Sequence, residues 1–168
     1  MQSHTTLHLY KQNFRFSAAH FLIFDAHRAE RLHGHNYQVE VELRGEQFNH
    51  QSGYYIEFKE IKKIIRDRLA RWNETVLMPA RNEEMKFATH GTTLEIIFRE
   101  RRYAFPVSEV VLLPTNNTSV EHLSRILAED LMGLLNAYGV QTIRVQVEET
   151  QGQAASCTLT RKSRVVDP

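Results

Sequence analysis

The chain has 168 residues, of which 42% are hydrophobic, so it can form one domain, 1–168, with a substantial core. Lys and Arg (21) nearly balance Asp and Glu (20), which gives no sign of a nucleic-acid partner. No apolar run approaches the ~18 residues of a membrane span, and the N-terminal residues lack the pattern of a signal peptide. The single cysteine, Cys157, permits no internal disulfide and fits a cytoplasmic protein.

Alternating residues predict strands in the first part of the chain. We expect strands at 7–19 and 36–44, paired as in a hairpin, because apolar and polar side chains alternate along the second one. A short strand is expected at 54–56. A helix should follow, since apolar residues recur at helical spacing, namely Phe58, Ile61, Ile65, Leu69 and Trp72.

The second part of the chain repeats this organisation. Thr118 and Glu121 have the spacing of a capping box, so a helix should begin there and run to about Tyr138, with Gly139 at its C′ position. Strands are expected at 142–149 and 157–161. The intervening segment, 85–114, contains three apolar stretches that predict extra short strands: 94–98, 103–105 and 110–113. The fold class is therefore α+β.

Three histidines form a candidate metal site. His33 and His35 stand two apart at the start of a predicted strand, so their side chains point to the same face. His20, at the end of the preceding strand, could supply a third nitrogen. Three neutral histidines with one open position are typical of catalytic zinc. The alternative is that two histidines stand by chance in a turn, since the chain contains 9 of them.

A set of motifs resembles the 6-pyruvoyltetrahydropterin synthase family, which includes 6-carboxytetrahydropterin synthase. The motifs occur in the family's order and comprise Phe16–His20, His33–Tyr37, Gly53–Phe58, Thr118–Leu123 and Val147–Thr150. Residues 85–114 have no counterpart that can be placed in the shorter members of the family.

The resemblance implies a tunnelling fold, an antiparallel four-stranded sheet with two helices on one face, assembled as a trimer or hexamer. It implies that His20, His33 and His35 hold Zn²⁺. It also implies that Glu149 accepts hydrogen bonds from a pterin substrate, because a carboxylate offers two acceptors to two parallel donors. Ser119, in the helix-opening motif, is a second candidate for substrate binding. Without the motif, Glu149 would be read as a surface ion-pair partner.

The chain departs from the family at the usual general base, a cysteine before the histidine pair. In the carboxy-type members that cysteine aligns with Ala29, whereas Glu30 stands three residues before His33. This spacing resembles a subtype with glutamate in place of cysteine, which cleaves the dihydroneopterin side chain. Glutamate, with a pKa of ~4.3 against ~8.5 for cysteine, is the weaker base. It therefore suits removal of a hydroxyl proton better than removal of a carbon-bound proton. The alternative is that Glu30 is an ordinary loop residue.

A second departure concerns the Asp-His pair that usually follows the first helix. Aligned from Trp72, those positions hold Asn73 and Glu74, neither of which is an ordinary proton donor near neutral pH. His27 is the preferred substitute, because it shares a loop with Glu30. His90 and His122 are the other candidates.

Three functions follow from these features. The first is a zinc-dependent lyase that cleaves a C–C bond in the side chain of 7,8-dihydroneopterin, or its triphosphate, to give 6-hydroxymethyl-dihydropterin. The second is a 6-pyruvoyl- or 6-carboxytetrahydropterin synthase with an acid–base set that lacks cysteine. The third is a zinc-bearing binder of pterins or purines without catalytic activity.

Overall fold

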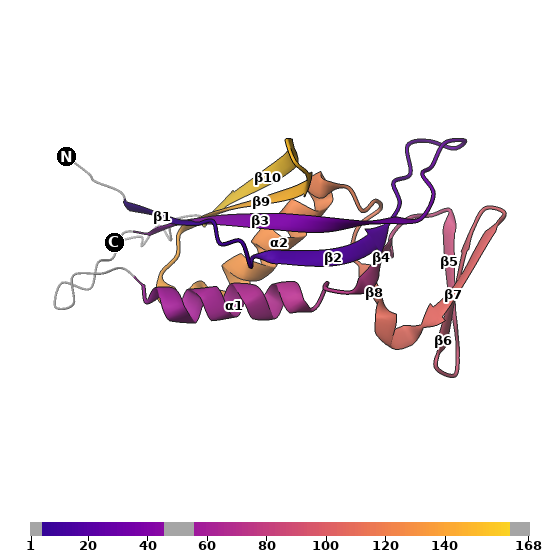
Figure 1. Ribbon diagram of the computed structural model, residues 1–168, viewed down its shortest axis with the longest axis horizontal. Helices are drawn as coiled ribbons and strands as arrows, with labels where there is room; N and C mark the ends of the chain where they lie inside the picture. The colour runs from indigo at the N-terminus through magenta and orange to yellow at the C-terminus, as the bar shows by residue number, and fades with distance from the viewer. Residues whose placement is uncertain (1–4, 46–55, 162–168) are drawn as a thin grey trace, which may run out of the picture.

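The computed structural model describes residues 5–45 and 56–161, and within them it confirms the α+β class (Figure 1). Of the strand expected at 54–56, residues 54 and 55 lie outside this part of the chain, as does Gly53. The elements are β1 (Thr5–Leu9), β2 (Arg15–His20), β3 (His33–Gly45), α1 (Phe58–Ala70), β4 (Thr75–Pro79), β5 (Met85–His90), β6 (Thr93–Phe98), β7 (Arg101–Pro106), η1 (Val107–Glu109), β8 (Val110–Leu113), α2 (Val120–Leu134), η2 (Asn136–Tyr138), β9 (Thr142–Thr150) and β10 (Gln153–Thr160).

The main sheet contains the predicted four antiparallel strands and extends beyond them. Its strand order is β10-β9-β3-β2-β4-β8, and the pairs β10–β9, β9–β3 and β3–β2 are antiparallel. The additional strands β4 and β8 continue the sheet in parallel pairings. The described sheet is thus mixed and seven-stranded, counting β1.

The single strand expected at 7–19 is divided into β1 and β2, which both pair with β3. A turn separates them, closed by the Phe14 N–H, which donates to the Lys11 carbonyl at 2.9 Å. The buried Phe14 then returns to the sheet, and its carbonyl accepts a hydrogen bond from the Val39 N–H at 2.7 Å. The interruption lets β2 end with His20 opposite His33.

Both helices pack against one face of the main sheet. Their apolar stripes join the inward-facing residues of the central strands, such as Val39 and Val145, in the larger hydrophobic core. The predicted stripe of the first helix is wrong at its start, because Phe58 is 47% exposed. The second helix ends at Leu134, and a short 3-10 turn leads to Gly139, which has φ = 68°.

The predicted capping box is not formed. Ser119, rather than Thr118, is the N-cap of α2, and it makes no side-chain capping bond. The hydroxyl of Thr118 instead donates to the carbonyl of Phe21 at 3.1 Å, so it holds the chain after β2. The approach to this helix is shaped by tertiary contacts.

Residues 85–106 form a second, three-stranded antiparallel sheet, β5-β6-β7, at the end of the molecule distant from β1 (Figure 1), whereas β8 joins the main sheet. The strands expected at 94–98, 103–105 and 110–113 are all present, whereas β4 and β5 were not predicted. A separate hydrophobic core lies against this sheet; its buried members are Phe21, Met78, Met85, Leu94, Ile96 and Phe98. No helix in the described residues is long and apolar enough to cross a membrane.

Arg68 connects the two helices. Its side chain is 7% exposed, lies over the Trp72 ring, and donates from Nε to the Asp130 carboxylate at 2.7 Å. We predict that Asp130→Ala lowers the free energy of unfolding by about 2 kcal/mol, because a buried cation loses its charged hydrogen-bond partner. Urea denaturation measures this change. Asp67→Ala, which removes only an exposed pair with Lys63, should cost less than about 0.5 kcal/mol. Equal effects for both variants would contradict the prediction.

Candidate metal and substrate site

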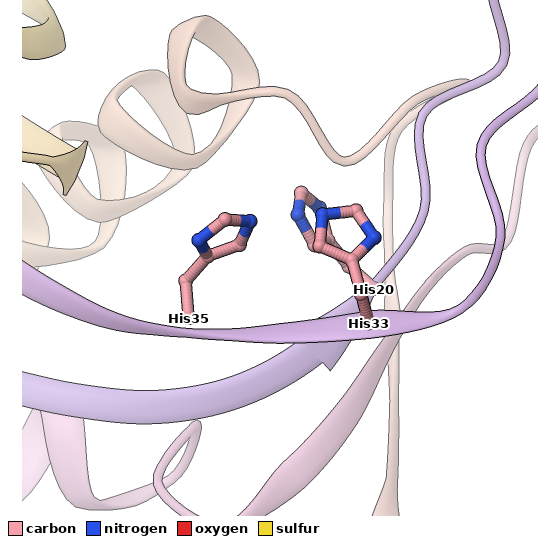
Figure 2. A group of neighbouring side chains, drawn as sticks. All are labelled: His20, His33 and His35. Atoms are coloured by element: carbon pink, nitrogen blue, oxygen red, sulfur yellow. The ribbon is translucent and has the colours of Figure 1, made fainter.

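The register of β2 on β3 brings the three predicted histidines together. His20 pairs directly with His33, and His35 follows two residues along β3 on the same face. The ring centroid of His20 lies 5.0 Å from that of His33 and 5.4 Å from that of His35. Figure 2 shows the three rings rising from one side of the two strands. One ligand atom from each lies within 4.8 Å of the others, so the group could hold a metal ion.

His20 is held in the neutral form that a metal ligand requires. Its ring is completely buried, and Nδ1 lies 3.0 Å from the Thr118 carbonyl, to which it can only donate. Burial lowers the pKa of His20, although the charge of Glu149 opposes this effect. The proton is therefore placed on Nδ1, and Nε2 presents its lone pair. That buried Nε2 has no hydrogen-bond partner among the described residues, as expected of an atom meant for a cation.

His33 is oriented in the same manner. Its Nδ1 lies 2.8 Å from the carbonyl of Arg31, which again leaves Nε2 as the ligand atom. Backbone carbonyls thus fix two of the three rings. A set of three imidazoles suits zinc and other borderline divalent metals, and the residues present therefore fit the expected ion.

Glu149, at the end of β9, points into the same site. Its Oε1 lies 3.0 Å from Nε2 of His20 and 3.4 Å from Nε2 of His35. The hydroxyl of Tyr37 donates to this oxygen at 3.3 Å. Burial, followed by the negative charge of Glu149, raises the pKa of Tyr37, which keeps the phenol protonated as a donor. The Tyr37 hydroxyl thereby orients the Glu149 carboxylate, and the Glu149 side chain remains 18% exposed.

Glu30 lies beside the histidines as well. Its Oε2 accepts a hydrogen bond from the Leu22 N–H at 3.0 Å and is 3.9 Å from Nε2 of His33. The backbone N–H of Glu30 in turn donates to the Leu22 carbonyl at 2.9 Å. These two bonds close the neck of the segment 21–32, which we name the Glu30 loop. The carboxylate is partly exposed and has a fixed direction.

The other predicted site residues are less central. Ser119 lies next to Thr118, and its hydroxyl is 3.2 Å from Nδ1 of His122. His27 is exposed at the tip of the Glu30 loop, where its N–H donates to the Asp25 carboxylate. Within the described residues, no contact joins the His27 ring to the three histidines.

Asn73 and Glu74 have structural contacts. The Asn73 side chain accepts a hydrogen bond from the Ser17 N–H at 2.9 Å, and the Glu74 N–H donates to the Ser17 carbonyl at 2.6 Å. Both residues line a cavity of about 630 Å³ with Ser17 and Asn36, which point to the sheet face opposite the histidines. Asn73 and Glu74 therefore hold the chain that leads into β4 against the edge of β2.

Sequence reasoning missed two functional contributions. Tyr37 belongs to the predicted apolar face of β3, and the two-residue period that aligns His33 with His35 also reaches Tyr37. That period was the available signal. The carbonyls of Arg31 and Thr118 carry no such signal, because backbone groups leave no residue pattern.

Comparisons with known proteins identify the family of this chain. The family model described as 6-pyruvoyl tetrahydropterin synthase matches residues 9–160. The chain belongs to this family. A protein of Methanocaldococcus jannaschii, named as a candidate 6-carboxy-5,6,7,8-tetrahydropterin synthase, is 31% identical over 144 residues, covering 84% of this chain and 87% of the relative.

Solved structures of the family confirm the tunnelling fold. The 6-pyruvoyl tetrahydropterin synthase of Plasmodium falciparum matches with a TM-score of 0.84 and 25% identity, over 95% of this chain and 99% of its own. A Plasmodium vivax synthase whose catalytic glutamate is replaced by alanine matches with a TM-score of 0.85 and 24% identity, over the same shares.

The geometry yields a prediction for metal binding. His35→Ala should weaken binding of a divalent metal by more than about 100-fold, because losing a ligand costs more than losing a group that orients one. Calorimetric titration of the metal-free protein with Zn²⁺ measures the affinity for zinc. His90→Ala is the control, since His90 is an exposed residue of the β5–β6 hairpin. Unchanged affinity in the His35 variant would exclude this site.

Proposed function

We propose that the protein is a zinc-dependent lyase that cleaves a C–C bond in the side chain of 7,8-dihydroneopterin or its triphosphate, giving 6-hydroxymethyl-dihydropterin. The observation that carries the proposal is the place of Glu30. Its carboxylate lies 3.9 Å from His33, beside the cluster of histidines, at a position where the chain has no thiol. The sole cysteine, Cys157, is on β10.

The histidine set supports zinc as the metal. His20, His33 and His35 would hold the ion through nitrogen atoms, two of which are fixed as lone-pair donors by backbone carbonyls. A bound zinc ion would act as a Lewis acid that makes substrate hydroxyls easier to deprotonate. The remaining chemistry is assigned to side chains of this chain.

Glu149 would bind the pterin ring. Its carboxylate would accept hydrogen bonds from the amino and ring N–H groups of the substrate, while Tyr37 orients it. We place the substrate side chain, in this arrangement, toward His33 and Glu30. Ser119 stands at the start of α2 as a second candidate contact.

Glu30 would act as the general base. It takes the proton of a side-chain hydroxyl, the neighbouring C–C bond breaks, and the hydroxyl carbon leaves as an aldehyde. The electron pair passes into the electron-poor pterin ring. A proton must then return to the carbon that remains on the ring, and protonated Glu30 can supply it. Its place beside the histidines makes Glu30 a better candidate for this return than His27, which lies at the exposed loop tip.

The second candidate is a 6-carboxytetrahydropterin synthase, favoured by the names of relatives such as the Methanocaldococcus jannaschii protein. Such a reaction would need another base in place of the thiol. Because Glu149 is assigned to the pterin ring, Glu30 remains as the carboxylate beside the histidines that could act as base, and both candidates use the same residue. They differ in product. The third candidate is a zinc-bearing protein that binds pterins or purines without turnover.

We also infer that the chain assembles as a homo-oligomer, a trimer or hexamer, as the family resemblance implies. Strand β10 pairs with β9 alone within the described residues, so its outer edge can accept a strand from a second copy. The sheet face opposite the helices is polar, with Arg144 bonded to Glu42 at 3.1 Å.

The product test decides the function. Zinc-loaded protein incubated with dihydroneopterin triphosphate, and separately with dihydroneopterin, should release 6-hydroxymethyl-dihydropterin, identified by chromatography and mass spectrometry. Glu30→Ala should lower kcat by about 10²- to 10⁴-fold, the usual contribution of a general base, with unchanged zinc content. Glu129→Ala, at an exposed carboxylate of α2, is the matched control.

Each other outcome selects an alternative. A 6-carboxy or 6-pyruvoyl product would favour the second candidate. Bound zinc and pterin with no product would favour the binder. Full activity of Glu30→Ala would show that the base is misassigned.

A separate prediction concerns substrate binding. Glu149→Gln should weaken binding of a dihydropterin by about 10- to 100-fold, because the amide replaces one acceptor with a donor that faces the substrate's own N–H groups. Fluorescence titration measures the affinity. Glu148→Gln is the control, since Glu148 lies on the opposite face of β9, where it accepts a hydrogen bond from the Gly152 N–H. Equal affinities in both variants would remove Glu149 from the binding site.

A further inference from the structure

The Glu30 loop rests on the three-stranded sheet. Phe21 belongs to the core of that sheet, with its ring centroid 5.3 Å from Phe98 and 6.0 Å from Tyr103. Ile23, Ala29 and Leu32 pack against the same core. Phe21, Ile23, Ala29 and Leu32 thus attach the loop to the core of this sheet, and Figure 1 places the loop at the same end of the molecule as the sheet.

Arg101, at the start of β7, contacts the loop at the residue that carries the carboxylate. Its guanidinium donates from one nitrogen to the Glu30 carbonyl and from the other to the Ala29 carbonyl, the latter at 3.3 Å. The same cation lies 5.8 Å from the centre of the Phe98 ring. A planar guanidinium is suited to this task, because its two parallel donors can fix two successive carbonyls at once.

These contacts complete a clamp on Glu30. Its N–H donates to the Leu22 carbonyl, its side chain accepts from the Leu22 N–H, and its carbonyl accepts from Arg101. The backbone on both sides of the side chain is therefore restrained. Without Arg101, Glu30 itself keeps only its two bonds with Leu22, although Asn117 and Thr118 still hold the first segment of the neck, so the carboxylate can shift relative to His33.

We propose that Arg101 is a positioning residue, through which the sheet β5-β6-β7 holds the Glu30 carboxylate beside the metal-binding histidines. The inference rests on the proposed role of Glu30 as base. The proposal gives the sheet β5-β6-β7 a task in the reaction, although this sheet contains neither the three candidate metal ligands nor Glu30 nor Glu149. Misplacement of a catalytic group by about 1 Å can cost 10²-fold in rate, so a clamp at this point has a measurable effect.

The test compares three variants in the full, zinc-loaded protein. Arg101→Ala removes both carbonyl contacts, and we expect kcat to fall about 10- to 100-fold, with KM for the pterin and zinc content unchanged. Arg101→Lys, which has a point charge in place of the planar fork, should recover only part of the rate. Arg102→Ala is the matched control, because Arg102 is 71% exposed and contacts Glu95.

Hydrogen exchange provides a readout that does not depend on activity. The amides of Leu22 and Glu30 donate the two bonds across the loop neck, so both should exchange faster in Arg101→Ala and remain unchanged in Arg102→Ala. If Arg101→Ala is too unstable to purify, Arg101→Lys carries both measurements.

The outcomes separate this inference from the proposed function. Faster exchange with an unchanged kcat would overturn the positioning role, and unchanged exchange would overturn the clamp itself. A loss of kcat accompanied by loss of zinc or a large rise in KM would also contradict the inference, because damage would then extend beyond Glu30. Full activity of Glu30→Ala, in contrast, would refute the base assignment whatever the Arg101 variants do.

Discussion

The antiparallel register between β2 and β3 is the constraint on which the site depends. It sets His20 opposite His33, and the two-residue period of β3 then adds His35 and Tyr37 to the same face. A shift by one residue would move these side chains to the polar face of the sheet. The register is secured by apolar residues farther along the strands, such as Phe16 and Tyr37, whose rings stack at 4.7 Å. Core packing and the metal site are therefore specified by one pairing.

The first hydrophobic core fixes the histidines and Glu149, whereas the second core determines the surroundings of Glu30. His20, His33, Tyr37 and Glu149 belong to strands of the main sheet. Glu30 belongs to a loop whose apolar residues pack on β5–β7. The side chains proposed to bind metal and substrate are thus carried by strands of the main sheet. The proposed base is carried by a loop, whose position depends on contacts with the second sheet. In the role proposed for Arg101, the sheet β5-β6-β7 supports this loop.

Much of this arrangement could be predicted from the sequence. Alternation along 36–44 and the helical spacing of Ile61, Ile65 and Leu69 located their elements within a few residues, because side-chain period follows directly from backbone geometry. For the same reason, the spacing of His33 and His35 predicted that their side chains share one face of the strand. The division of 7–19 into two strands was not predictable, since it depends on a turn at residues 11–14 that only pairing with β3 makes favourable. The Thr118 capping box failed because its hydroxyl bonds to Phe21, 97 residues away in the sequence.

The electrostatics of the site explain why these groups belong with a cation. His20 is driven toward neutrality by burial, and its Nε2 lone pair faces Glu149 Oε1 at 3.0 Å without a hydrogen bond between them. A second nitrogen, from His35, lies 3.4 Å from the same oxygen. The lone pair of His20 Nε2 and the Glu149 carboxylate repel one another in a partly buried setting, where the effective dielectric is lower than in water. A divalent cation held by His20, His33 and His35 would offset that repulsion, because it would attract both the imidazole nitrogens and the carboxylate. Glu149 is thus suited to both tasks proposed for it, because its negative charge would stabilise a cation while its oxygens would accept hydrogen bonds from a ligand with paired donors.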